Sequence, residues 1–263
     1  MSAVEEAARI VAKPARMNMP VVFFTGAGIS EESGIPTFRG RAGIWRKHDP
    51  EEVATPEGFM SDPTRGWRFH EQLRQICLAG SPNVAHLSLA WIEAALSPDT
   101  DTAVITQNID GLHQAAGSGE VIEIHGSAHR VRCLECDFAG DDLPREFDEL
   151  PPRCECGELL RPDVVWFGEQ LPREAFDEAQ EWARKAAVLL MIGTSATVQP
   201  AASLPVLALQ SGAELIEINP SPTVLSEVAE ITLRATAGSV MPELAEAVVQ
   251  LLNGESIADV EAE

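Results

Sequence analysis

The chain has 263 residues, and 45% of them are hydrophobic, which is enough for one large α/β domain with insertions or for two small domains. Its 41 acidic residues outnumber 19 lysines and arginines, so the net charge is −22. A polyanion of this kind repels nucleic acid and anionic lipid, and we expect neither as a direct partner.

The first predicted elements are a helix and a strand. Residues 1–19 place apolar side chains at helical spacing, and the apolar run at 20–24 predicts a buried strand. The helix carries acidic residues where a signal peptide is apolar, and no apolar run reaches the ~18 residues of a membrane span. We therefore expect a cytoplasmic protein.

A turn rich in small residues follows the first strand. Gly26, Ala27 and Gly28 stand at the strand end, and Glu31 and Glu32 suit the first turn of a helix. Backbone N–H groups at such a turn hold a pyrophosphate, to which Arg39 could add a charge-assisted contact. The third glycine of the dinucleotide fingerprint is missing, so the turn alone does not predict a nucleotide site.

The rest of the chain alternates strands with helices after a helical stretch. We predict strands at 102–106, 121–124, 187–192, 214–218 and 231–233, and helices at 173–185, 201–210 and 242–252. This alternation indicates an α/β fold with a Rossmann-like, doubly wound parallel sheet that binds its ligand at the strand C-termini. We predict a discontinuous Rossmann-like domain (1–40, 100–127 and 162–252), a helical module (41–99) and a small inserted module (128–161).

Four of the five cysteines form two close pairs. Cys133 and Cys136 are separated from Cys154 and Cys156 by 17 residues, close to the spacing of a structural Zn²⁺ ribbon. The second pair has one intervening residue in place of two, and His129 is an alternative fourth ligand. Two incidental reduced pairs are the competing interpretation. Cys77 lies in a helical stretch and is expected to be a buried hydrophobic residue.

Polar side chains follow several of the predicted strands. Gln107, Asn108 and Asp110 follow the strand at 102–106, and His125 follows the strand at 121–124. Because parallel strands end at the same edge of a sheet, these groups would face one cleft. A single such residue in a loop is more often a cap or a surface group, but their joint placement favours a catalytic site.

At this point the sequence resembles the sirtuin family. The motifs GAGIS, SGIPTFRG, TQNIDGLH, IHG, RPDVVWFGE, GTS and EINP occur in the family's order over roughly residues 5–250. The resemblance implies an inverted Rossmann-like domain joined to a zinc ribbon and a helical module. It also implies an NAD-dependent protein-lysine deacylase, most readily a deacetylase, with NAD as co-substrate and one structural Zn²⁺. We expect acyl-lysine proteins or peptides as substrates, and a monomer.

The resemblance also assigns residue roles. The acyl oxygen attacks the nicotinamide ribose, and His125 then accepts a proton through the ribose hydroxyls, giving free lysine, nicotinamide and O-acyl-ADP-ribose. The catalytic residues would be His125, Asn108 and Asp110. The NAD contacts would be Gly26, Ala27, Gly28, Ile35, Phe38, Arg39, Gln107, Asn108, Ile109, Asp110, Gly193, Thr194, Ser195, Asn219 and Ala237. The substrate contacts would be His70, Leu73, Val165, Phe167, Gly168, Glu169 and Val198.

One segment departs from a subclass pattern. Aligned on Trp67 and Phe69, His70 and Leu73 stand where desuccinylase-type sirtuins have a Tyr and an Arg that bind an acyl carboxylate. Unless Arg74 turns into the pocket, this favours a neutral acyl group. We expect His113 to have a structural hydrogen-bonding role and His86 to pack within the helical module.

Other functions stay open. Protein mono-ADP-ribosyl transfer would use the same NAD cleavage with another acceptor. A non-catalytic NAD or ADP-ribose sensor would not need the base. Acidic residues within the ribbon disfavour nucleic-acid binding, and the missing fingerprint glycine disfavours a dehydrogenase.

Overall fold

The computed structural model describes residues 2–38, 43–97 and 99–254, so Arg39 of the predicted NAD contacts lies outside the described residues. Six parallel strands form the main sheet in the order β3-β2-β1-β7-β8-β9. They are β1 (Val21–Thr25), β2 (Thr102–Thr106), β3 (Val121–Glu123), β7 (Val188–Ile192), β8 (Glu214–Ile218) and β9 (Ile231–Leu233). The chain reverses direction across the sheet at β1, which is the classical Rossmann order, and the predicted doubly wound sheet is confirmed.

The central strands β1 and β7 are apolar except for Thr25, the last residue of β1. All five residues of β1 and all five of β7 are buried. A parallel strand that is covered on both faces needs such a continuous apolar run, which is why the sequence around these two strands does not alternate.

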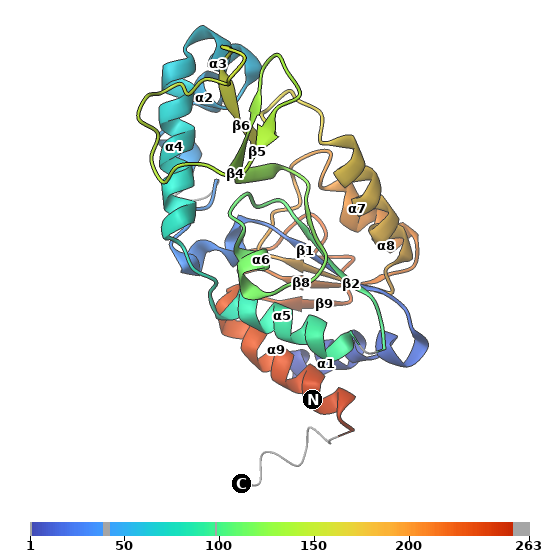
Figure 1. Ribbon diagram of the computed structural model, residues 1–263. Helices are drawn as coiled ribbons and strands as arrows, with labels where there is room; N and C mark the ends of the chain where they lie inside the picture. The colour runs from blue at the N-terminus through green and yellow to red at the C-terminus, as the bar shows by residue number, and fades with distance from the viewer. Residues whose placement is uncertain (1, 39–42, 98, 255–263) are drawn as a thin grey trace.

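Helices α1 (Ala3–Ala12), α5 (Val84–Leu96) and α9 (Ala237–Leu252) cover one face of the sheet (Figure 1). Leu89 and Ile92 of α5 share a core with Leu244 and Val248 of α9. Helix α5 lies within residues 41–99, which we predicted as one helical module, but its buried side chains belong to the core of the main sheet. Its apolar spacing predicts a helix, but spacing does not say which core the helix faces.

Helices α7 (Arg173–Lys185) and α8 (Ser203–Gln210) cover the opposite face (Figure 1). Ala179 and Ala183 of α7 belong to the same buried cluster as Leu204 of α8 and the side chains that the strands turn toward this face. The small alanines let α7 lie close to the strands, and both faces of the sheet are thereby closed.

A second unit stands above the C-terminal edge of the main sheet (Figure 1). It contains helices α2 (Pro50–Val53), α3 (Pro56–Ser61) and α4 (Pro63–Ala79) and the antiparallel strands β4 (Gly126–Cys133), β5 (Ala139–Gly140) and β6 (Leu160–Val164). Asp49, Thr55 and Asp62 each cap one of the three helices, and each precedes a proline at the first helical position. The prolines in this stretch therefore begin helices.

The helices and strands of this second unit share one core. Trp67 of α4 donates from its indole N–H to the carbonyl oxygen of Leu160 in β6, 2.7 Å away. Phe59, Val131 and Trp166 belong to the same buried cluster. The predicted helical and zinc-ribbon modules are thus joined by a common core.

The remaining elements are short. They are η1 (Pro14–Met17), η2 (Ala27–Ile29), η3 (Glu31–Ser33), η4 (Ile44–Arg46) and α6 (Leu112–Ala116). Among the residues that the structure describes, no helix combines the length and the hydropathy needed to cross a membrane.

Candidate active site

Three glycines bring the turn after β1 against the turn after β7. A Cβ atom on Gly28 would lie 2.8 Å from the Cα of Gly193, and one on Gly26 would lie 2.8 Å from the Cβ of Thr194. Gly193 has a φ of 62°, and its carbonyl oxygen accepts from Gly28 N at 2.9 Å. Only glycine allows this backbone contact, which forms a narrow cradle suited to phosphate groups.

Asn108 and Asp110 are buried around the hydroxyl of Ser30. Ser30 Oγ donates to Asp110 Oδ2 at 2.7 Å and accepts from Asn108 Nδ2 at 3.1 Å. Asp110 Oδ1 also accepts from the backbone N of Leu112 at 3.0 Å. Burial raises the pKa of Asp110, while the bonds from Leu112 and Ser30 oppose that rise.

The imidazole of His125 lies beside the carbonyl oxygen of Gln107. The distance from His125 Nδ1 to that oxygen is 2.9 Å. A carbonyl oxygen can only accept, so Nδ1 carries the proton and Nε2 holds a lone pair. Burial lowers the pKa of His125, although the bond to Gln107 opposes this, so the neutral ring persists at neutral pH.

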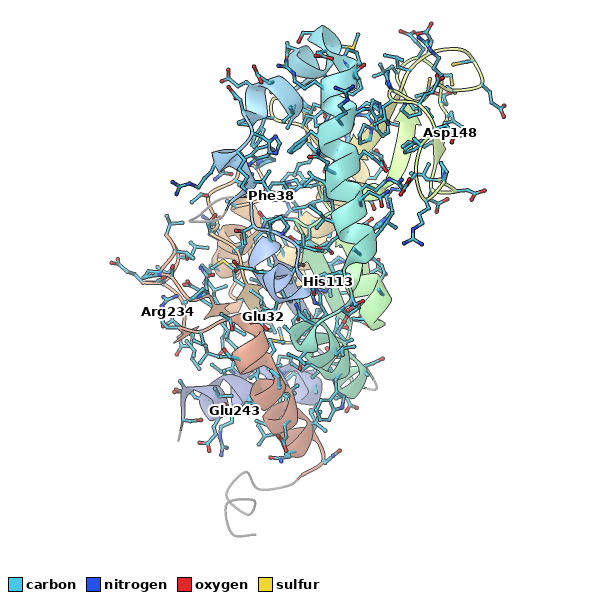
Figure 2. The ribbon with its side chains drawn as sticks, turned by 90° about the vertical axis from the view of Figure 1, so that its left-hand side faces the viewer. Glu32, Phe38, His113, Asp148, Arg234 and Glu243 are labelled. Atoms are coloured by element: carbon cyan, nitrogen blue, oxygen red, sulfur yellow. The ribbon has the colours of Figure 1, made fainter. Side chains whose placement is uncertain are left out.

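Six of the predicted NAD contacts line one cavity: Ala27, Ile35, Phe38, Asn108, Ile109 and Asp110. Leu73 and Cys77 of α4 close the far wall. Figure 2 shows Phe38 beside α4, above Glu32 and Arg234. The predicted burial of Cys77 is confirmed. The cavity is apolar except for the amide and carboxyl groups, as a small aromatic amide would require.

Gln107 links this cavity to the glycine cradle. Its side-chain amide donates to Thr194 Oγ1 at 2.8 Å, and its backbone N donates to the carbonyl oxygen of Thr25 at 3.0 Å. Ser195 is exposed next to Thr194, and its hydroxyl lies 2.9 Å from that of Thr197. These polar groups extend the site along the strand ends.

Asn219 and Ala237 lie at the other end of the same edge. Asn219 follows β8 and donates from Nδ2 to the carbonyl oxygen of Ser221 at 2.9 Å. Ala237 is the first residue of α9. Arg234, labelled in Figure 2, pairs with the buried carboxylate of Glu217 at 2.6 Å and holds the loop near Asn219.

Two residues that support the site, Ser30 and His86, were not predicted as part of it. Ser30 joins Asn108 to Asp110, and His86 Nε2 lies 3.4 Å from the Ser30 hydroxyl. His86 was expected to pack within the helical module, but it belongs to α5 and is buried beneath the site. The position of Ser30 just after the glycine turn was the available signal. The structural role expected for His113 is confirmed by its 2.9 Å contact with the hydroxyl of Thr25.

The loop from Val165 to Glu169 borders the site. Val165 N donates to the carbonyl oxygen of His125 at 3.0 Å, and Phe167 is exposed. The carboxylate of Glu169 faces inward, where it accepts two bonds from Arg161, at 2.5 and 2.9 Å. Glu169 was predicted as a substrate contact, but its carboxylate is bonded within the protein and stabilises the loop to which it belongs. Val198 is half-buried in the loop after β7.

His70 and Leu73 lie deeper, on α4. His70 is buried and lines a second cavity with Leu73 and Ile109, between α4 and the strands β4 and β6. Leu73 and Ile109 also line the first cavity, so they form the partition between the two. Arg74 borders the second cavity, and both its Nε and its Nη2 donate to Glu71 at 2.8 Å.

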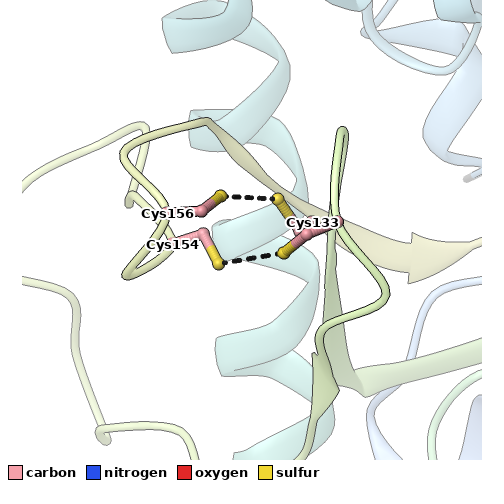
Figure 3. Close-up of side chains that lie close together, drawn as sticks. Cys133, Cys154 and Cys156 are labelled. Atoms are coloured by element: carbon pink, nitrogen blue, oxygen red, sulfur yellow. Dashed lines mark hydrogen bonds between the residues drawn. The ribbon is translucent and has the colours of Figure 1, made fainter.

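The four paired cysteines form a compact cluster (Figure 3). All four sulfur atoms lie within 4.8 Å of one another, with Cys133 to Cys156 at 3.5 Å and Cys136 to Cys154 at 3.7 Å. Tetrahedral ligation of Zn²⁺ at about 2.3 Å places sulfurs about 3.8 Å apart, whereas a disulfide needs about 2.05 Å. The geometry fits a zinc site. His129 instead bonds the carbonyl oxygen of Asp110, so it is not needed as a ligand.

Comparison with known proteins gives the family. The Sir2 family model matches residues 26–200, more than half of the chain. The chain is 47% identical over 232 residues to NAD-dependent protein deacylase 2 of Pyrobaculum aerophilum, covering 88% of this chain and 92% of that protein. It is 48% identical over 240 residues to the NAD-dependent protein deacylase of Aeropyrum pernix, covering 90% and 94%.

Solved structures agree. A Sir2 homologue in complex with NAD is 42% identical, with a TM-score of 0.86 and 94% of each chain covered. A mutant Sir2 homologue bound to 2′-O-acetyl ADP ribose is 42% identical, with a TM-score of 0.87 and coverage of 96% of this chain and 98% of that chain. The resemblance to sirtuins is thereby confirmed, and the chain belongs to the Sir2 family of NAD-dependent protein deacylases.

Proposed function

We propose that the protein removes neutral acyl groups, acetyl first among them, from lysine side chains of proteins at the expense of NAD. The observation that carries the proposal is the tautomer of His125. Its bond to Gln107 fixes the proton on Nδ1 and directs a neutral Nε2 as a general base. Simple binding of NAD would not require a base at this position.

Different residues at the strand ends would bind the nicotinamide, hold the phosphates and accept the proton. When bound, NAD supplies a ribose carbon from which nicotinamide can leave. Asn108 and Asp110 would bind the nicotinamide amide, because Ser30 fixes both side chains in one orientation. The glycine cradle at Gly26, Gly28 and Gly193 would hold the phosphates through backbone N–H groups. His125 Nε2 would accept the proton from the ribose hydroxyls.

The acyl-lysine peptide would lie beside the loop from Val165 to Glu169. This loop is tied to the base through the bond from Val165 N to the carbonyl oxygen of His125, so peptide position and base position are coupled. Two solved relatives support peptide substrates: one was studied with a deacetylated p53 peptide and another with a myristoylated histone peptide. Main-chain hydrogen bonding to such a loop tolerates many peptide sequences.

The neutral acyl preference is supported by the pairing of nearby arginines. Arg74 is neutralised by Glu71, and Arg130, which also borders the second cavity, pairs with Glu123 at 2.7 Å and Asp163 at 3.1 Å. A succinyl carboxylate that entered the second cavity would lose its hydrating water, and neither Arg74 nor Arg130 would be free to pair with it. Binding of a succinyl group should therefore be unfavourable. We further propose a structural role for zinc at the four cysteines, a monomeric enzyme and no direct role for nucleic acid.

The proposal is tested by incubating the protein with an acetyl-lysine peptide and NAD, with each component omitted in turn, and measuring nicotinamide release. Nicotinamide release that requires the acetylated peptide and equals the lysine formed supports the deacylase. Release without peptide, with ADP-ribose added to protein, would support the transferase. Binding of NAD without any release would support the sensor.

A further inference from the structure

His70 lines the second cavity and is hydrogen-bonded to a tryptophan of the loop from Val165 to Glu169. Its Nε2 lies 2.9 Å from the indole Nε1 of Trp166, and both side chains are buried. The two rings are 5.8 Å apart at an interplanar angle of 32°. The contact joins α4 to the loop that the proposed function assigns to the peptide.

The bond sets the protonation of His70. The indole N–H can only donate, so Nε2 must be unprotonated to accept it. The same Nε2 lies 3.1 Å from the carbonyl oxygen of Val53. It could donate a hydrogen bond to that oxygen only when it carries a proton. Burial lowers the pKa of His70 to about 3, so the ring is neutral under ordinary conditions. The tautomer with its proton on Nδ1 leaves Nε2 free to accept from Trp166.

Trp166 is the internal anchor of the loop. Its ring packs on Phe59 at 4.7 Å and lies under the guanidinium of Arg161, at 3.4 Å from the ring centroid. Its backbone N donates to Glu169 at 2.9 Å, and Glu169 in turn pairs with Arg161. Its neighbour Phe167 donates from its backbone N to the carbonyl oxygen of Ala54 at 2.9 Å.

We propose that His70 is a positioning residue that fixes Trp166, and through it the backbone of residues 165–169, in the conformation that receives the peptide. The inference rests on the proposed function, because it takes this loop as the peptide site. It also replaces the expected role of His70 as an acyl contact. Loss of the bond would leave the indole N–H buried without its acceptor, and the loop would shift to find another.

The test measures steady-state kinetics of the full chain with an acetyl-lysine peptide. His70→Phe keeps an aromatic ring and removes the acceptor, and Trp166→Phe removes the donor. Each should raise the peptide KM about tenfold, while the KM for NAD stays within about twofold. The two substitutions remove the same hydrogen bond, so their effects should not add. The peptide KM of the double variant should equal that of the single variant with the higher peptide KM. His70→Gln, whose amide oxygen can accept from the indole, should restore most of the peptide affinity.

Trp91→Phe, on the exposed face of α5, is the matched control and should leave both KM values unchanged. Melting temperature and zinc content verify folding, and Trp166→Phe carries the test if His70→Phe does not fold. Unchanged peptide KM in the folded variants, or additive effects in the double variant, would overturn the positioning role. Absence of NAD-dependent deacetylation in the unsubstituted protein would instead overturn the proposed function.

Discussion

The carbonyl oxygen of Gln107 accepts a hydrogen bond from His125 Nδ1 at 2.9 Å, and the side chain of Gln107 donates to Thr194 at 2.8 Å. One residue therefore orients the proposed general base and also contacts the loop of the proposed phosphate cradle. Both contacts come from the residue that directly follows β2, so the proposed base and the proposed cradle are tied to the same strand end.

Replacing His125 with Ala should abolish deacylation and leave the fold intact. Removal of a positioned general base typically lowers a rate by about 10²- to 10⁴-fold, and the ring is partly exposed, so little core packing is lost. Turnover of an acetyl-lysine peptide and the melting temperature should be measured together. A variant that keeps full turnover would show that another group acts as the base.

Acidification should destabilise the protein through its buried histidines. Burial lowers the pKa of His70 to about 3, of His86 to about 4 and of His113 to about 3. Each has a pKa near 6.5 in the unfolded chain. Below that pH these histidines are protonated in the unfolded chain but stay neutral in the folded chain. Stability is therefore lost as the pH falls, by about 3 kcal/mol for the three together between pH 6.5 and 5.5.

Urea unfolding at pH 7.5, 6.5 and 5.5 measures this loss, which should be small in the first step and large in the second. Burial raises the pKa of Asp110 and of Glu93, so these carboxyls add stability as the pH falls, opposite to the histidines. His113→Gln should remove about a third of the slope between pH 6.5 and 5.5. A free energy of unfolding that does not change over this range would contradict the burial of neutral histidines.

Replacing Cys133 with Ser should release the metal and destabilise the second unit. Four thiolates within 4.8 Å of one another would repel without a cation, and the ribbon has little core of its own. Metal content and melting temperature are the measurements. Cys77→Ala is the control, because Cys77 lies apart from the cluster and its loss should leave about one zinc per chain. Full zinc content in Cys133→Ser would argue against the four-cysteine site.

Leu73 should control the acyl preference. It lies in the partition between the two cavities, and the neighbouring Arg74 is engaged by Glu71. The unsubstituted protein should prefer acetyl-lysine to succinyl-lysine by at least about tenfold in kcat/KM. Leu73→Arg should reverse this order by supplying a cation, and Leu73→Met is the uncharged control. Equal turnover of both acyl groups by all three proteins would show that residue 73 does not select between neutral and charged acyl groups.

The elements that the sequence predicts best are those with strong local signals. The strands at 214–218 and 231–233 and the helix at 173–185 have the bounds that were predicted. The cysteine cluster was also predicted, because ligand spacing is a local property. Helix α9 begins at Ala237, before the predicted start at Pro242. Proline is favoured in the first turn of a helix, which suggested a start there, but Pro242 stands inside this helix.

What the sequence did not predict depends on contacts between distant segments. The place of α5 against the main sheet depends on which core its apolar side meets. The inward direction of Glu169 follows from Arg161, and the partner of His70 is a tryptophan 96 residues away. Such pairings arise when the chain folds on itself, and no local spacing encodes them.

The central claim is tested most directly by mass spectrometry of a single reaction that contains an acetyl-lysine peptide and NAD. The account predicts that O-acetyl-ADP-ribose and deacetylated peptide form in equal amounts, and that neither forms with the His125→Ala variant. Free acetate in place of O-acetyl-ADP-ribose, or ADP-ribose attached to the peptide, would contradict it.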